Sequence, residues 1–227
     1  MKKTISILAA ACMLAPALVQ ADERQEVKRA ANIISRLNRI PENGIPAAIL
    51  RNARGLAIIR VYKAGFGVSG RVGNGVVVAR TRAGWSGPAF ISLAGAGFGP
   101  QIGAQATDYV LVLNTQNAVE AFARGANITL GGDLSVAVGP VGRTFEVGVT
   151  PMAAIYAYSQ SRGLFAGASL EGTALISRRE SNADFYGRDI APISILRGRI
   201  APPRGATPLL SALQGPRRIP GERVAYR

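Results

Sequence analysis

Apolar residues near the N-terminus recur at helical spacing. Residues 22–40 place aliphatic side chains three and four positions apart, which predicts an amphipathic helix that ends at Pro41. Its apolar half consists of Val27, Ala30, Ala31, Ile33, Ile34, Leu37 and Ile40. A second, short helix is expected from Pro46 to about Ala53, because proline suits the first turn of a helix.

The polar half of the first helix is basic. It carries no carboxylate and five cations, which are Arg24, Lys28, Arg29, Arg36 and Arg39. Two interpretations stay open. The cations solvate the outer face of a helix that covers the core, or they lie on lipid phosphates while the aliphatic half inserts into a bilayer interface.

Glycine-punctuated apolar runs follow, and they have the length and composition of strands. Between Gly55 and Gly103 we expect strands at 56–62 and 75–80, and a further strand at 109–113. Asn-Gly favours a type I′ turn, so the sequence Gly73-Asn74-Gly75 predicts a hairpin and antiparallel pairing.

The second half of the chain repeats this character. Strands are expected at 134–138, 143–149, 153–159 and 164–177, and helices at 118–124, 180–186 and 208–213. We therefore predict one domain of the α+β class at 22–200, a curved antiparallel sheet, sandwich-like or barrel-like, with a few peripheral helices. Residues 201–227 form a basic, proline-rich tail with little to bury.

The first 21 residues read as an export signal. Lys2 and Lys3 precede an apolar run, and Val19-Gln20-Ala21 is a small-residue cleavage site. We expect a chain that begins at Asp22, periplasmic or secreted and peripherally associated with a membrane. An alternative is lipoprotein processing at Cys12, where the cysteine would be acylated.

The composition favours a globular, cationic protein. Hydrophobic residues make up 48% and charged residues 18%, which is typical of a packed domain. Loss of Lys2 and Lys3 would lower the net charge from +14 to +12. Such a charge attracts anionic lipid, nucleic acid or acidic polysaccharide, and export makes nucleic acid the least suitable partner.

The residues give little support to catalysis. The chain has no histidine, which excludes Ser-His-Asp and Cys-His mechanisms and any metal site that needs histidine. The nearest carboxylate cluster, Glu171, Glu180, Asp184 and Asp189, has the spacing of a solvated rim. The G-x-G-x-x-G match at 65–70 leads into a strand instead of a helix, so we interpret it as a turn or bulge. We expect no enzyme and no cofactor.

The aromatic residues are interpreted as core. Trp85 stands alone in Gly84-Trp85-Ser86-Gly87-Pro88, and we expect its ring to be buried at a corner of the sheet. The same role is expected for Tyr62, Phe66, Phe98, Tyr156, Tyr158 and Phe165.

Several glycine-rich motifs, in order, resemble the SYLF domain family, as a bacterial exported member. They include Gly44-Ile45-Pro46, Ala64-Gly65-Phe66-Gly67, Gly84-Trp85-Ser86-Gly87-Pro88, Gly97-Phe98-Gly99, Gly131-Gly132-Asp133, Tyr158-Ser159-Gln160-Ser161-Arg162-Gly163, Leu170-Glu171-Gly172 and Phe185-Tyr186-Gly187. The resemblance spans roughly residues 30 to 190. It implies lipid binding, described for phosphoinositides in eukaryotic members that carry Src-homology or FYVE modules, and actin binding by some of them.

The resemblance and the basic helix together lead to one expectation. The protein would bind anionic phospholipid or phosphoinositide-like headgroups without catalysis, through Arg24, Lys28, Arg29, Arg36 and Arg39. The alternative is a structural or protein-interaction module of the cell envelope. We expect anionic lipids and an envelope protein as partners, and neither nucleic acid nor, for an exported chain, actin.

Overall fold

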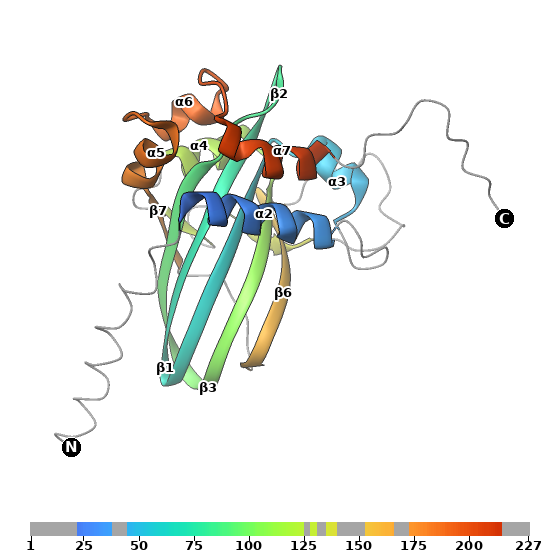
Figure 1. Cartoon of the computed structure of the whole chain (residues 1–227). Coiled ribbons are helices and arrows are strands. Elements are labelled where there is room, and N and C mark those ends of the chain that lie inside the picture. The colour runs from blue at the N-terminus through green and yellow to red at the C-terminus, as the bar shows by residue number, and fades with distance from the viewer. Residues whose placement is uncertain are drawn as a thin grey trace.

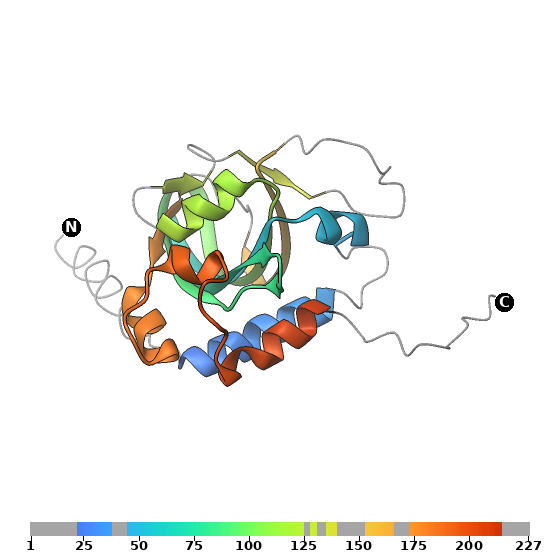
Figure 2. The ribbon, with the colours of Figure 1, turned by 90° about the horizontal axis from the view of Figure 1, so that it is seen from above.

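The structure, a computed structural model, describes residues 22–37, 45–124, 128–130, 135–139, 153–165 and 173–214. A curled sheet forms its centre (Figures 1 and 2). Its strands are β1 (Gly55–Thr81), β2 (Gly84–Trp85), β3 (Ala89–Leu113), β4 (Ile128–Leu130), β5 (Val136–Val138), β6 (Ile155–Phe165) and β7 (Thr173–Ser177). The strand order is β2-β1-β3-β6-β5, with β7 paired to β3 and β4. The pairs are antiparallel except β5 with β6, so the predicted α+β class and curved sheet are confirmed.

β1 turns back on itself at the lower end of the sheet in Figure 1. Its pairing with β3 runs in two stretches, and the register shifts between Phe66 and Val68. The two halves of β1 lie side by side, because a methyl group added to Gly75 would collide with the carbonyl oxygen of Ile58. The glycine-rich segment at 65–70 is thus a turn with an irregularity, as its sequence predicts.

The hairpin turn predicted at Gly73-Asn74-Gly75 is wrong. Asn74 lies inside the sheet opposite Ser92, whose Oγ donates a hydrogen bond to Asn74 Oδ1 at 2.8 Å. Glycine is needed at position 75 because the neighbouring half of β1 passes too close for a side chain. Glycine occurs both in tight turns and where two strands approach closely, so the local sequence does not distinguish the two.

Helices cover the sheet on two sides. α4 (Gln116–Arg124) and α6 (Pro192–Leu196) lie over its upper end (Figure 2) and pack against the inner face through residues such as Phe122 and Ile195. Thr115 caps α4, since its Oγ1 accepts a hydrogen bond from the Ala118 amide at 3.1 Å. α2 (Glu23–Leu37), α3 (Ala47–Asn52), α5 (Arg179–Tyr186), the 3-10 turn η2 (Arg204–Ala206) and α7 (Thr207–Gln214) belong to the outer layer.

α2 confirms the amphipathic helix. Its predicted apolar residues from Val27 to Leu37 are between 0 and 7% exposed and pack on the outer face of the sheet. The interpretation that this half inserts into a bilayer does not describe this structure, in which the sheet already covers it. None of the described helices is long and apolar enough to cross a membrane.

The first part of the tail predicted at 201–227 contains the helix expected at 208–213, which is α7. α7 lies alongside α2 (Figure 2), and Leu209 is fully buried between α7 and the rest of the outer layer. The apolar positions of 207–214 therefore outweigh the surrounding prolines and charges. The export signal at 1–21, Cys12, Arg39, the expected strand at 143–149 and the end of the tail at 215–227 lie outside the described residues.

The aromatic residues divide between core and surface. Tyr156 and Tyr158 are buried as predicted, and Trp85 is half-buried with the Arg80 guanidinium 4.1 Å from its ring centre. Tyr62 and Phe66 are 50% and 80% exposed, so their assignment to the core is wrong. The side chains of Phe98 and Phe165 lie outside the described set.

Candidate functional site

A basic groove runs along α2 where this helix meets β1. It is an open hollow of about 610 Å³ lined by Gln25, Lys28, Arg29, Asn32, Ser35, Arg36 and Arg60. The α2 residues recur at three- and four-residue intervals and therefore share one side of the helix. All seven lining residues are polar, and four of them are cations.

Asp108 of β3 holds two of these cations. Arg60 donates from Nε to Oδ1 at 2.6 Å and from Nη2 to Oδ2 at 2.8 Å, and Arg36 donates from Nη2 to Oδ2 at 2.7 Å. Burial alone would raise the pKa of Asp108, but hydrogen bonds and charges from Arg60 and Arg36 outweigh it and lower this pKa. Asp108 is thus a charged carboxylate under two arginines.

The groove retains an excess of positive charge. Within the described part of the chain, Lys28 and Arg29 form no ion pair, and Arg36 and Arg60 share one carboxylate. Four cations against one carboxylate leave a local net charge of +3. This arrangement suits an anion that carries several negative oxygens, such as a phosphorylated headgroup.

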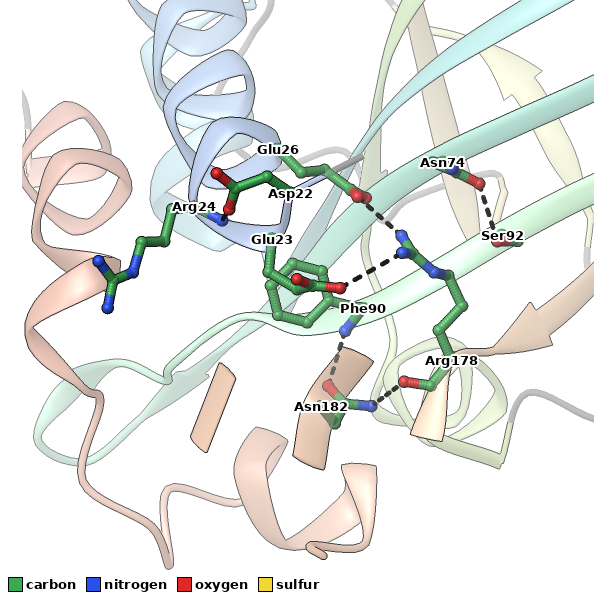
Figure 3. A network of polar contacts seen from close by, with 9 residues as sticks. All are labelled: Asp22, Glu23, Arg24, Glu26, Asn74, Phe90, Ser92, Arg178 and Asn182. Atoms are coloured by element: carbon green, nitrogen blue, oxygen red, sulfur yellow. Dashed lines mark hydrogen bonds and ion pairs between the residues drawn. The ribbon is translucent and has the colours of Figure 1, made fainter. Parts of the chain in front are cut away.

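The structure gathers three of the five predicted site residues, Lys28, Arg29 and Arg36, in this groove. Arg24 lies outside it, next to Gly205 of η2, and Figure 3 shows its side chain pointing away from Glu26. Arg39 falls outside the described residues. The sequence analysis did not predict Arg60 as a site residue. Its position two residues after Ile58 puts this charge on the outward side of the strand, which could have indicated it.

A second polar cluster fixes the start of α2 to the region before α5 (Figure 3). Arg178 donates from Nη1 to Oε2 of the buried Glu26 at 2.7 Å, and its Nη2 lies 3.7 Å from Oε1 of Glu23. Asn182 donates to the Arg178 carbonyl and accepts from the Phe90 amide, both at 2.9 Å. These contacts join the helix, the sheet and α5.

Glu26 has an unusual ionisation. Its residue is 2% exposed, and burial raises its pKa from the ordinary 4.5 to about 7, although the Arg178 charge and hydrogen bond act in the opposite direction. Sequence reasoning missed this residue. Its signal was spacing, because Glu26, Ala30, Ile33 and Leu37 fall on one side of a helix.

The acidic cluster considered for catalysis lies at the surface. Glu180 and Asp184 of α5 are exposed, and Asp189 forms an exposed ion pair with Arg179 at 3.2 Å. Glu171 lies outside the described residues. Across the described ranges, no three acidic or cysteine side chains come together in a way that could hold a metal ion.

Comparison with known proteins assigns the family. Residues 94–215 match the model of the Ysc84 family, described as "Las17-binding protein actin regulator". The chain belongs to this family. The resemblance to the SYLF domain is thereby confirmed.

Relatives in yeast and mammals support the assignment. The chain is 47% identical over 201 residues to LAS seventeen-binding protein 3 of Saccharomyces cerevisiae, which covers 84% of this chain and 44% of that protein. It is 48% identical over 198 residues to SH3 domain-containing YSC84-like protein 1 of Homo sapiens, which covers 84% of this chain and 58% of that protein. The chain spans about half the length of the curated relatives it matches. No solved structure matches it.

These names correct one expectation. We expected no actin binding, whereas the family is described as an actin regulator and the yeast relative is named for binding a protein, Las17. The expectation rested only on the export signal, and residues 1–21 say nothing about surfaces that the remaining chain shares with its relatives. The names denote binding and regulation, not a chemical reaction.

Proposed function

We propose that this protein is a non-catalytic binding module that docks on anionic phospholipid headgroups through the basic groove. The observation that carries the proposal is the local excess of cations formed by Lys28, Arg29, Arg36 and Arg60 around the single carboxylate of Asp108. Arginine pairs well with phosphate because its guanidinium donates two parallel hydrogen bonds.

The strength of such docking follows from charge. Each cation near an anionic membrane surface contributes about 1 kcal/mol, so a local excess of three supports roughly a hundredfold preference over a neutral surface. Asp108 holds Arg36 and Arg60 at the groove but neutralises one of its four positive charges. Recruitment by this groove does not require α2 to leave the sheet.

A second candidate is an acidic protein surface. The family description and the name of the yeast relative favour an actin filament or a protein similar to Las17 as the partner. An acidic protein would be attracted by the same cations. The two candidates differ in where the chain works, because lipid headgroups line the cell envelope whereas actin is found inside cells.

Co-sedimentation distinguishes these candidates. The purified protein is mixed with phosphatidylcholine vesicles, with vesicles that also contain an anionic phospholipid, and with filamentous actin. Pelleting with anionic vesicles alone, reduced by added salt, would support lipid docking. Pelleting with actin alone would support the second candidate, and pelleting with neither would overturn both.

The cellular address remains part of the proposal. We propose that residues 1–21 direct export and are removed, so that the groove meets a membrane surface of the envelope in the periplasm or outside the cell. The lipoprotein alternative through Cys12 would place the same groove beside a membrane by a covalent anchor.

A further inference from the structure

The helices that the structure describes cover the outer face of the sheet only in part. In Figure 1, α2 and α7 cross its upper half, and β1 and β3 continue below α2 with no described helix over them. Two large aromatic side chains, Tyr62 and Phe66, stand on this lower part and are 50% and 80% exposed. Exposed aromatic rings of this size mark contact surfaces more often than ordinary surface.

Small apolar residues surround these rings. Ala106 is the cross-strand partner of Tyr62, and Ala104 is that of Ala64. Ala64, Ala104 and, on the other half of β3, Ala96 are exposed. We call Tyr62, Ala64, Phe66, Ala96, Ala104 and Ala106 the lower face. Below Arg60, the outward-pointing side chains that the structure describes on β1 and β3 include no charged group.

The lower face continues directly from the basic groove. Arg60 lines the groove, and Tyr62 follows it two residues later on the same side of β1. Phe66 lies six residues below Arg60, which is about 20 Å of extended strand. A single outer surface therefore presents cations first and aromatic and aliphatic groups beyond them. An anionic bilayer presents phosphate charge first and hydrocarbon beyond it, and aromatic rings concentrate between the two.

We infer that the lower face is the side of the protein that enters an anionic bilayer, with the Phe66 and Tyr62 rings in the interface and Lys28 and Arg29 on lipid phosphates. The inference rests on the proposed lipid function and adds the inserting element. It assigns insertion to the turn of β1, while the aliphatic half of α2 stays buried against the sheet. Charge complementarity with the adjoining groove favours a bilayer over a second copy of this cationic chain.

A tryptophan reporter tests the insertion directly. Phe66→Trp is made in a Trp85→Phe background, so that the only indole stands at the turn of β1, and its fluorescence is recorded with anionic vesicles whose acyl chains carry bromine. Asn117→Trp in the same background is the matched control, because Asn117 is exposed on α4 at the opposite end of the sheet. We expect the vesicles to quench position 66 and not position 117.

Loss of the rings supplies a second measurement. Tyr62→Ser with Phe66→Ser should weaken binding to anionic vesicles roughly tenfold, because the variant lacks the two rings whose apolar surface is removed from water on insertion. Val138→Ser, which removes another exposed apolar side chain on β5, should leave binding unchanged. Native circular dichroism in each variant ensures that the comparison concerns the surface and not the fold.

The outcomes separate the inference from the function beneath it. Vesicle binding without quenching at position 66 would overturn insertion by the lower face and leave headgroup docking intact. The inference would also be overturned if vesicles did not change the emission of the tryptophan at position 66 but actin or a higher protein concentration did. The lower face would then bind a protein. No binding to vesicles at all would overturn both.

Discussion

The Asp108 carboxylate receives two hydrogen bonds from one guanidinium, at 2.6 Å from Arg60 Nε and 2.8 Å from Arg60 Nη2. Its Oδ2 also accepts from Arg36 of α2 at 2.7 Å. A single acidic side chain on β3 thus connects the outer helix to β1. It also reduces the charge of the groove by one, so stability and anion binding oppose each other at this residue.

Asp108→Asn should separate these two effects. The free energy of unfolding should fall by about 1–3 kcal/mol, because a charge-assisted contact is lost beneath two partly buried arginines. Affinity for anionic vesicles should rise about fivefold, since the groove gains one net positive charge. Chemical denaturation and vesicle sedimentation measure the two quantities. Asp189→Asn makes the same charge change in the exposed pair that Asp189 forms with Arg179 of α5, and it should alter neither quantity.

Glu26 should make stability depend on pH. Its pKa is about 7 in the folded protein and 4.5 ordinarily, so the folded state binds the proton more tightly than the unfolded state. Protonated Glu26 therefore adds stability on the order of 3 kcal/mol, which is fully present below about pH 4.5. This contribution to the free energy of unfolding is lost as the pH rises toward 7. Glu26→Gln should flatten this part of the pH profile measured by denaturant unfolding. An identical slope in the variant and the parent would contradict the assignment.

Lys28→Gln with Arg29→Gln should weaken binding to anionic vesicles by roughly thirtyfold at low salt, because two cations of the groove are removed. Stability should change little, since neither side chain forms an ion pair in the described structure. Arg24→Gln is the matched control on the same helix, outside the groove. An equal loss of binding free energy per charge removed in Arg24→Gln would show that overall charge, and not the groove, determines binding.

The mass of the protein isolated from its cell tests the export proposal. We expect a chain that begins at Asp22, because Val19-Gln20-Ala21 has the form of a cleavage site. A chain that begins at an acylated Cys12 would identify a lipoprotein, and an unprocessed chain inside the cell would favour the actin-related candidate.

Elements specified by neighbouring residues were predicted well from sequence. α2, α3 and α4 follow from apolar spacing, Pro46 and the cap at Thr115, which are all local signals. A turn was wrongly predicted at 73–75, because glycine at 75 serves a contact with Ile58, which is distant along the chain. Which segments approach each other is a property of the whole sheet.

The candidate site was predicted in part for the same reason. Helical spacing brought Lys28, Arg29 and Arg36 together, whereas Arg60 and Asp108 reach the groove only through sheet pairing. Tyr62 was assigned to the core because a strand shows which residues share a face, not how far a covering helix extends. The ring of Tyr62 is exposed because it lies beyond the edge of α2.

The packing of α7 against α2 has a consequence for the order of folding. These helices begin at Glu23 and Thr207, so the residues of the whole sheet are synthesised before the two helices can meet. Contacts between segments this distant in sequence form late and slowly, because the chain loses the conformational entropy of the long intervening loop before the contact can stabilise it. Until Leu209 packs against it, α2 is only partly buried. The newly made chain then exposes aliphatic side chains of α2 that other chains or chaperones can bind. We therefore expect interruption of synthesis before Arg204 to yield a product that retains its strands and aggregates.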